Sequence, residues 1–324
     1  MSTCELPLVS IVIPAYNHEK YVQETIQSVI AQDYPRIELI VIDDGSKDST
    51  WAKIEEMRTA CEKRFERVVM LSQDNAGTAM TLGRLFDLAK GEFVGCIASD
   101  DAFTNCAVST LIKPLQVNPA IGLVVGINEV MDGKGRRCFW DDARNIVYDE
   151  DKATIKTLND FIMKVSGVDY NSPAFGSYEK MIRINHVPNG AIIRRRCICE
   201  ILPFSSDAPL EDWWMHLQLT KICKYKYIPV TTFRYRWHGS NTMLRNNWIT
   251  EVTKKTISYE AAVVWKSRQQ KFISAINSIV TGERFVFRIH YLCHVVCRDT
   301  HYYRYWRIGA KGHYITFWRR CIMK

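Results

Sequence analysis

Three pairs of neighbouring acidic residues carry the strongest chemical signal in the sequence. They are Asp43-Asp44, Asp100-Asp101 and Glu211-Asp212, and the first two directly follow apolar runs. Carboxylates of this kind bind hard divalent cations such as Mg²⁺, which prefer oxygen ligands. A carboxylate can also act as a general base that removes a proton from a hydroxyl group. Which chemistry is available depends on which pairs the fold brings together.

The first hundred residues alternate between strand-like and helix-like patterns. Short apolar runs predict buried strands at 9–13, 38–42, 68–72 and 93–99. Helical spacing of apolar residues lies between them, at 18–32 and 78–89. Near-continuous apolar strands that alternate with helices indicate a mostly parallel sheet covered on both faces. Such sheets bind ligands at the carboxyl ends of their strands, so we expect a site that includes Tyr16, Asp44 and Asp100.

The sequence lacks the glycine motifs that bring a backbone close to a phosphate group. Neither GxGxxG after the first strand nor GxxxxGK(S/T) at any position is present. A diphosphate bound at this edge would therefore need a metal ion held by carboxylates.

The later part of the chain is less regular. We expect a strand at 121–131, a loop-rich segment at 171–189 and a helix that opens near Glu211-Asp212. An alternating segment at 227–237 predicts a further strand, which ends at His238. Beyond residue 241 the pattern becomes helical, basic and aromatic.

The composition is that of a globular protein and excludes several other classes. The chain has 324 residues, of which 47% are hydrophobic and 24% are charged, which excludes a disordered or collagen-like protein. Its eleven cysteines, with no CxxC pair, favour reduced thiols over a disulfide framework. No apolar run approaches the roughly 18 residues that a membrane-spanning helix needs. No positive charge precedes the first apolar run, so we expect no secretory signal.

The positive charge is concentrated at the C-terminal end. Residues 284–324 contain nine Lys and Arg against one acid, Asp299, and ten aromatic residues. The rest of the chain has 34 basic and 34 acidic side chains. A basic, aromatic tail favours an anionic membrane surface or a nucleic acid as its neighbour. We expect the membrane surface, because no RNA-binding signature accompanies the tail.

Several of these segments, taken in order, resemble family 2 glycosyltransferases. VSIVIPAYN, IELIVIDDGSKDST, DNAG, KGEF and ASDD are similar to the nucleotide-binding half of that family, and PNGAIIRR, PLEDWW and FRYRWH to its acceptor half. Among relatives the sequence most resembles bacterial enzymes that build O-antigen or capsule repeat units for lipopolysaccharide and other polysaccharides. The resemblance covers roughly residues 8–240.

The resemblance implies an α/β fold of the GT-A type, with a Rossmann-like, mostly parallel central sheet flanked by helices. It assigns residues 1–110 to the nucleotide-sugar-binding half and residues 111–240 to the acceptor-binding half. We expect residues 241–324 to form a helical, basic and aromatic extension that associates with a membrane.

The resemblance also implies a set of donor-binding residues. Asp44 matches the acid that reads the N3–H group of uracil, although it could instead be a helix cap. Tyr16 matches a position that stacks on the nucleoside, with core packing as the alternative. Arg84 is a weak substitute for a family arginine and asparagine, which are Leu82 and Gly83 here. The full donor-binding set is Pro14, Ala15, Tyr16, Glu19, Asp44, Asn75, Gly77, Arg84, Ser99 and Asp100.

Asp100 matches the family acid that binds Mn²⁺ or Mg²⁺ against the diphosphate. Asp101 and His238 are further candidate ligands, His238 being about equally well interpreted as a surface histidine. The first acid of the usual Asp-x-Asp pattern is Ala98 here, which puts contacts to the nucleotide in doubt.

Glu211 and Asp212 match the family's catalytic pair. We assign Asp212 as the base of an inverting transfer and Glu211 as a contact to the acceptor or the donor sugar. Two acids in the first turn of a helix would also be favoured by the helix dipole alone.

The resulting hypothesis is a UDP-hexose-dependent transferase, with glucose or galactose added in β-1,3 linkage to lipid-linked GlcNAc. The acceptor, on undecaprenyl diphosphate, would lie at the cytoplasmic face of a bacterial inner membrane, with the enzyme bound peripherally. A non-catalytic binding module is the alternative suggested by Ala98, and a nucleic-acid-binding protein the one suggested by the tail. A zinc site on one helical face is a minor alternative that would use His290, His294, Cys297 and His301.

Overall fold

The computed structural model describes most of the first 262 residues and a short part of the remainder. The described residues are 6–204, 211–239, 241, 251, 253–262, 302–308 and 314–320. The four candidate zinc ligands and most of the segment beyond residue 241 that was expected to be helical lie outside them. The chain divides into two compact units, Met1–Ile257 and Ser258–Lys324. None of the described helices is long and apolar enough to cross a membrane.

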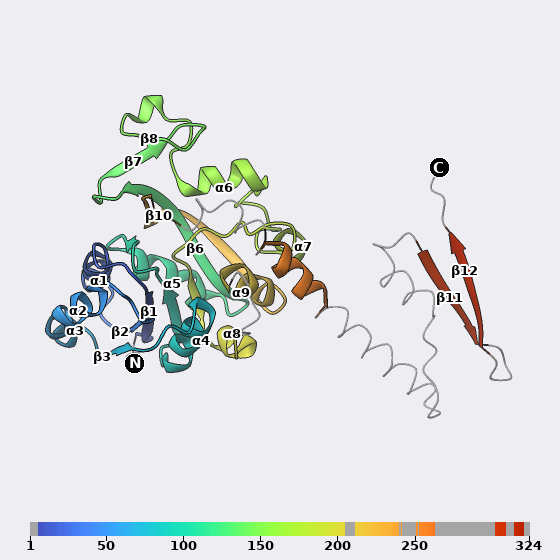
Figure 1. The fold of residues 1–324 in the computed structure, drawn as a ribbon, viewed down its shortest axis with the longest axis horizontal. Helices are drawn as coiled ribbons and strands as arrows, with labels where there is room; N and C mark the ends of the chain where they lie inside the picture. The colour runs from blue at the N-terminus through green and yellow to red at the C-terminus, as the bar shows by residue number, and fades with distance from the viewer. Residues whose placement is uncertain are drawn as a thin grey trace. The chain divides into compact units, whose positions relative to one another are not determined.

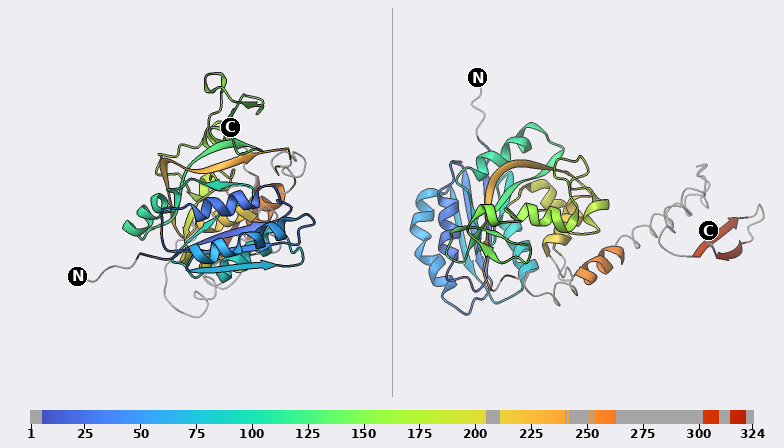
Figure 2. Two further views of the ribbon diagram at one scale, coloured as in Figure 1. Left: turned by 90° about the vertical axis from the view of Figure 1, so that its left-hand side faces the viewer. Right: turned by 90° about the horizontal axis from the view of Figure 1, so that it is seen from above.

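The first unit is built on one large sheet with helices on both faces (Figures 1 and 2). Its strand order is β3-β2-β1-β4-β9-β6-β10-β5, and β7 and β8 continue from β6. The strands are β1 (Val9–Ala15), β2 (Ile37–Asp43), β3 (Arg67–Ser72), β4 (Phe93–Cys96), β5 (Ala102–Phe103), β6 (Ile121–Asp132), β7 (Arg137–Trp140), β8 (Ile146–Val147), β9 (Ile192–Arg194) and β10 (Lys224–Trp237).

The helices fall between these strands along the chain. They are α1 (Val22–Ile30), α2 (Thr50–Glu56), α3 (Arg58–Arg64), α4 (Thr78–Leu88), α5 (Ala107–Val117), α6 (Leu158–Ser166), α7 (Tyr178–Met181), α8 (Arg195–Ile201) and α9 (Glu211–Leu219), with a 3₁₀ turn at Glu150–Lys152. The expected α/β architecture with a mostly parallel sheet is confirmed.

Strand direction decides which loops meet at one edge of the sheet. β1, β2, β3 and β4 are mutually parallel, and β9 runs antiparallel to both β4 and β6. Two antiparallel steps restore the direction, so β6 and its parallel neighbour β10 point the same way as β4. The residues that follow β1, β2, β4 and β10 therefore lie at the same edge.

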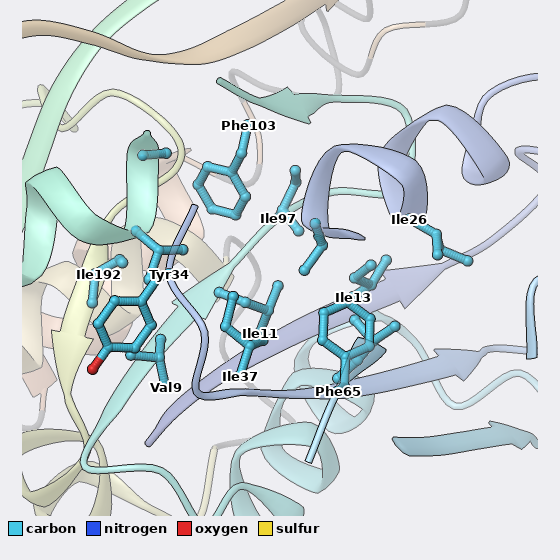
Figure 3. Close-up of a cluster of buried hydrophobic side chains, with 14 of the residues drawn as sticks. Val9, Ile11, Ile13, Ile26, Tyr34, Ile37, Phe65, Ile97, Phe103 and Ile192 are labelled. Atoms are coloured by element: carbon cyan, nitrogen blue, oxygen red, sulfur yellow. The ribbon is translucent and has the colours of Figure 1, made fainter. Parts of the chain in front are cut away.

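The core explains why the first strands read as continuous apolar runs. β1 and β2 are buried along almost their whole length: α4 packs against both strands, and side chains of α1 and α5 join theirs in one apolar cluster. Ile11, Ile13, Ile37 and Phe103 belong to an extensive hydrophobic cluster, shown in Figure 3. A smaller cluster around Trp140 joins β7 to α6 and to the end of β10.

β1 extends two residues further than the pattern indicated. Pro14 lies inside the strand, opposite Ile42, although it cannot donate a backbone hydrogen bond. The pairing of β1 with β4 ends at Val12, so no partner strand requires that donor. Proline is tolerated because the sheet is open on that side at this residue.

The second unit is not wholly helical, which corrects our expectation for the extension. Residues 253–262, which span the division between the units, are helical. β11 (Tyr302–Ile308) and β12 (Tyr314–Arg320) form a two-stranded antiparallel hairpin. Aromatic residues have high strand propensity, and their density here favours the hairpin over a helix.

Candidate functional site

The site is assembled from loops at the carboxyl edge of the sheet. The loop after β1 is joined to the loop after β2, because the Asn17 amide donates to Ser46 Oγ at 2.9 Å and the His18 amide to Thr50 Oγ1 at 2.8 Å. Asn17 has a φ of 54°, a left-handed conformation that asparagine tolerates better than most residues. These contacts fix the position of the His18 side chain.

One imidazole from each of two loops meets a carboxylate from a third. The ligand atoms of His18, Asp100 and His238 all lie within 4.8 Å of one another. His238 Nε2 is 3.1 Å and His18 Nε2 is 3.8 Å from Asp100 Oδ2. The structure therefore brings together Asp100 and His238, both predicted from the sequence, and adds His18, which was not. A histidine in the loop after the first strand, at the ligand-binding edge, was the signal available for it.

Burial and charge act in opposite directions on these groups. Burial disfavours ionised Asp100, but the hydrogen bond from His238 and the proximity of both histidines outweigh it and hold the pKa of Asp100 below its ordinary value. Burial lowers the pKa of His18, which favours the neutral imidazole. An ionised carboxylate and a neutral imidazole are the forms that bind a metal ion.

Asp101 does not belong to this group, contrary to the sequence-based expectation. Its Oδ1 accepts from the Arg236 amide at 2.8 Å, and its Oδ2 lies 3.5 Å from Asn189 Nδ2. Burial and the charge of Asp100 raise the pKa of Asp101 well above its ordinary value. The side chain is 2% exposed and turned into the protein, so it holds the loop rather than a ligand.

Arg236 organises the surroundings of both aspartates. It is fully buried, and its guanidinium donates to the Asp100 carbonyl at 2.6 Å and to Glu24 Oε2 at 2.6 Å. The same group lies 4.9 Å from the centre of the Tyr21 ring, on which His238 is stacked at 5.0 Å. The short antiparallel pairing of β5 with β10 brings Arg236 to this position.

The Glu211-Asp212 pair begins α9, as expected. Asp212 Oδ1 accepts from the Trp213 amide at 2.6 Å, and its Oδ2 accepts from Asn185 Nδ2 at 3.2 Å. Asn189, four residues after Asn185, contacts Asp101. The segment 185–189 therefore connects the Glu211-Asp212 pair to the loop that carries Asp100. Burial, with the negative charges of the pair added, raises the pKa of the Cys96 thiol, at the end of β4, to about 12. The pair therefore lies beside the strand that leads to Asp100.

Both acids of the pair are weaker than ordinary carboxylic acids. Burial, together with the charge of Asp212, raises the pKa of Glu211 to about 7. Burial also raises the pKa of Asp212. Many protein atoms lie around the Asp212 carboxyl group, which accounts for its raised pKa. The residue is nevertheless exposed to solvent, so an incoming hydroxyl group can reach it.

The predicted nucleotide side forms a separate hydrogen-bonded network. Asp44 Oδ1 accepts from Gln73 Nε2 and from the Ala76 amide, both at 2.8 Å, and Oδ2 accepts from the Gly77 amide at 3.0 Å. Arg84 joins it through Gln73, whose Oε1 accepts from the guanidinium at 2.6 Å. The structure thus links Asp44, the loop that contains Asn75 and Gly77, and Arg84.

The other residues predicted to bind the sugar donor lie at the end of β1 and in the adjoining loops. Ala15 accepts from the Asp44 amide at 2.8 Å, and Glu19 Oε2 accepts from the Ser49 amide at 2.9 Å. Tyr16 is 45% exposed and free to face a ligand. Ser99 is buried against His18, whose Nδ1 lies 2.8 Å from Ser99 Oγ.

Comparison with known proteins agrees with this geometry. Residues 10–165 match the model of the family described as glycosyl transferase family 2. The chain is 34% identical over 260 residues to the glycosyltransferase GlyG of Streptococcus pneumoniae serotype 4, an alignment that covers 78% of this chain and 80% of GlyG. This chain belongs to glycosyltransferase family 2.

Other relatives of this glycosyltransferase include chondroitin synthase of Pasteurella multocida, which is 27% identical over 243 residues. That alignment covers 74% of this chain but 22% of the synthase. Among solved structures, a mannosyltransferase from Pyrobaculum calidifontis, in complex with GDP-Man and Mn²⁺, superposes with a TM-score of 0.57 at 15% identity. The match covers 80% of this chain and 65% of that protein.

The second structural match supports the same fold. TarS of S. aureus, in complex with UDP-GlcNAc, superposes with a TM-score of 0.51 at 17% identity, over 73% of this chain and 60% of that one. Both structures have the GT-A fold, which this glycosyltransferase shares.

The places where this glycosyltransferase departs from the family pattern have local explanations. Leu82 and Gly83 stand where an arginine and an asparagine are usual, and both are buried in α4. A Cβ atom on Gly83 would lie 3.5 Å from Cβ of Phe204, which packs against Phe86 and Trp214. A polar pair would be buried among aromatic rings at these positions. The role left to Arg84 on the exposed face stays a prediction.

The donor set at His18, Asp100 and His238 fits a divalent ion. One carboxylate oxygen and two imidazole nitrogens lie within 4.8 Å, close enough for one ion to touch all three. This spacing leaves the other coordination positions to oxygens of a bound molecule.

Proposed function

We propose that this glycosyltransferase inverts the anomeric centre of a hexose as it transfers the sugar from a UDP-sugar to a lipid-linked saccharide. The acceptor we propose is a GlcNAc-type saccharide on undecaprenyl diphosphate, for the synthesis of O-antigen or a similar polysaccharide. The observation that carries the proposal is the segment 185–189, which joins Asp212 to the loop of Asp100. It couples a candidate base to a candidate diphosphate-binding group.

Asp212 would remove the proton from the acceptor hydroxyl group. The oxygen then attacks the anomeric carbon from the side opposite the diphosphate, a new C–O bond forms, and the bond from that carbon to the diphosphate breaks. The Asn185 side chain and the Trp213 amide hold the carboxylate in one orientation during this step. The raised pKa of Asp212 makes it a stronger base than an ordinary aspartate.

The donor would bind across the edge formed by β1, β2 and β4. The loops of Tyr16 and Asp44 are the proposed nucleoside side, and Asp100 with the two histidines is the diphosphate side. A divalent ion held there would supply positive charge against the departing diphosphate. Arg236, although buried, positions this side through the Asp100 carbonyl.

Relatives support the donor class and leave the sugar to be tested. The chondroitin and hyaluronan synthases of Pasteurella multocida are among them, and TarS binds UDP-GlcNAc. We propose glucose or galactose, added in β-1,3 linkage. The basic C-terminal segment would hold the enzyme at the cytoplasmic face of the inner membrane, where a lipid-linked acceptor lies.

The test is transfer by the full-length protein to a synthetic lipid diphosphate GlcNAc. UDP-glucose, UDP-galactose, UDP-GlcNAc and GDP-mannose would be compared, with product linkage and anomeric configuration determined by NMR. Asp212→Asn should lower kcat by about 10²–10⁴-fold, the usual contribution of a general base. Asp87→Asn, an exposed acid on α4, is the matched control and should keep full activity.

Near-wild-type turnover by Asp212→Asn would show that Asp212 is not the general base. Donor binding by calorimetry without transfer or donor hydrolysis would instead support the non-catalytic binding module. A product that retains the donor's anomeric configuration would contradict the inverting step.

A further inference from the structure

The candidate metal site formed by His18, Asp100 and His238 has fewer carboxylate ligands than the sequence suggested. Of the two adjacent acids, Asp101 is turned away and bonded to the Arg236 amide. The group that remains has one carboxylate, from Asp100, and two imidazoles, from His18 and His238. Two of its three protein donors are therefore nitrogen atoms.

His18 is held in the orientation that a metal ligand requires. Its Nδ1 lies 2.8 Å from Ser99 Oγ, and its Nε2 faces Asp100 Oδ2 at 3.8 Å. A hydrogen bond from one ring nitrogen to a neighbouring acceptor is the usual partner of a metal-bound histidine, because it fixes the ring and leaves the other nitrogen unprotonated. The Ser99 contact supplies such a bond when His18 Nδ1 carries the proton.

The second imidazole is also fixed before any ligand arrives. His238 is stacked on Tyr21 at 5.0 Å, and its backbone amide donates to Asn241 Oδ1 at 2.5 Å. Its ring lies 6.2 Å from that of His18, edge to face. Tyr21 also contacts the buried Arg236, and its ring lies 6.0 Å from that of His18, so both histidines pack against a residue tied to the core.

We propose that His18 is a third protein ligand, and that the site binds a first-row transition ion in preference to Mg²⁺, before the nucleotide binds. The proposal rests on the proposed function only for the use of the remaining coordination positions by a diphosphate. It goes beyond the sequence-based expectation, which placed Asp100, Asp101 and His238 at this site and left the ion as Mn²⁺ or Mg²⁺.

The donor set gives the reason for the preference. Mg²⁺ demands oxygen ligands in near-ideal octahedral geometry and loses its water reluctantly. Imidazole nitrogen binds more favourably to transition ions, with affinity rising from Mn²⁺ to Co²⁺ along the first row. Three preformed protein ligands, where one or two carboxylates suffice for a nucleotide-borne Mg²⁺, allow the ion to bind without nucleotide.

The experiment measures metal binding by the full-length protein in the absence of any nucleotide. Mn²⁺ is titrated while the signal of free Mn²⁺ is followed by electron paramagnetic resonance, and Mg²⁺ and Co²⁺ are added as competitors. We expect the order Co²⁺, Mn²⁺, Mg²⁺ from tight to weak, with Mn²⁺ at least about tenfold tighter than Mg²⁺. Pulsed measurements on bound Mn²⁺ should show ¹⁴N modulation from imidazole.

Three variants separate ligation from folding. His18→Ala should weaken Mn²⁺ binding by at least about tenfold and reduce the depth of the ¹⁴N modulation. His18→Asp, which replaces the imidazole with an oxygen ligand, should reduce the difference in binding affinity between Mn²⁺ and Mg²⁺. Lys20→Ala, in the same loop and exposed, is the matched control and should leave all these values unchanged. Thermal unfolding without metal shows whether each variant is folded.

Equal affinities for Mg²⁺ and Mn²⁺, or ¹⁴N modulation that is unaffected by His18→Ala, would overturn the proposal. Mn²⁺ that binds only when UDP is present would overturn its claim of binding before the nucleotide. If His18→Ala does not fold, the wild-type ion order and the His18→Asp comparison still decide it. Metal binding as described without sugar transfer would reject the proposed function alone.

Discussion

Two adjacent acidic side chains at the start of α9 are both harder to ionise than ordinary carboxylic acids, mainly because of burial. Glu211 has its pKa raised to about 7, and Asp212 is shifted in the same direction. Such a pair loses its protons in two coupled steps, so its apparent pKa values belong to the pair. Burial of both side chains, with the charge of Asp212 added at Glu211, sets the pH at which the proposed base becomes available.

We therefore expect the kcat/KM of sugar transfer to fall below about pH 7 as the pair takes up a proton. Glu211→Gln removes a negative charge next to Asp212, which favours the ionised base, so the acid limb should move to lower pH by about one unit or more. Rates measured from pH 5 to pH 9 with the wild type and Glu211→Gln check this. If the acid limb of the kcat/KM profile lies at the same pH in both proteins, a group other than this pair controls the fall in rate.

The same pair should reduce the stability of the folded protein at neutral pH. A carboxyl whose folded pKa is raised costs nothing below its unfolded value of 4.5, and the full cost is present above about 7. The rise corresponds to at most about 3 kcal/mol. Glu211→Gln should therefore increase the melting temperature at pH 8 and give little gain at pH 4. Asp87→Asn should show no such pH-dependent gain.

The sequence predicted two of the three residues of the candidate metal site, Asp100 and His238. There is a physical reason why it did not predict the third, His18. Asp100 and His238 were placed by the ordered motifs, and the structure brings them together. Of two adjacent acids, spacing alone does not show which faces the ligand, and the Arg236 amide draws Asp101 inward. His18 was missed because its role depends on Ser99, which lies 81 residues away along the chain.

At the scale of elements, the parallel half of the sheet was predictable and the antiparallel half was not. Strands β1, β2 and β4 are buried along most of their length, β3 at the edge is partly buried, and all four contain apolar runs. β5 and β8 have two residues each and β9 has three, too short for a periodic signal. Their pairing depends on contacts between distant segments, such as β9 with both β4 and β6.

The turn that precedes β9 illustrates how an element is positioned. Gly190 has a φ of 75°, and a Cβ atom there would lie 2.1 Å from the Phe233 ring on β10. Its neighbour Asn189 contacts Asp101. We expect Gly190→Ala to destabilise the protein by at least about 3 kcal/mol, because a clash is added to the left-handed strain.

Gly167→Ala provides the matched comparison for that prediction. Gly167 ends α6 with a φ of 65°, but a Cβ atom there would meet nothing within 4 Å. The strain alone should cost about 1–2 kcal/mol. Denaturant unfolding of both variants separates the two contributions, and equal costs would show that the Phe233 ring moves aside.

At the scale of the whole molecule, the distribution of charge separates two parts of the chain. Residues 1–283 carry no net charge, and residues 284–324 carry a net charge of +8. Anionic lipid attracts each basic side chain near its surface by about 1 kcal/mol. The proposed catalytic residues Glu211 and Asp212 lie in the first unit, so surface binding and chemistry should be separable.

A chain that ends at residue 262 keeps the helical residues 253–262 and removes the basic segment. We expect it to transfer sugar to a short-chain, water-soluble acceptor at a rate within about threefold of the full chain. Its binding to vesicles that contain anionic lipid, measured by co-sedimentation, should fall by at least about 100-fold, since several basic contacts are lost together. Binding of the full chain should weaken in high salt, because salt screens exposed charges. A truncated chain that still sediments with anionic vesicles would place the membrane contact in the first unit, whereas tight binding of the full chain to RNA would assign the tail to nucleic acid.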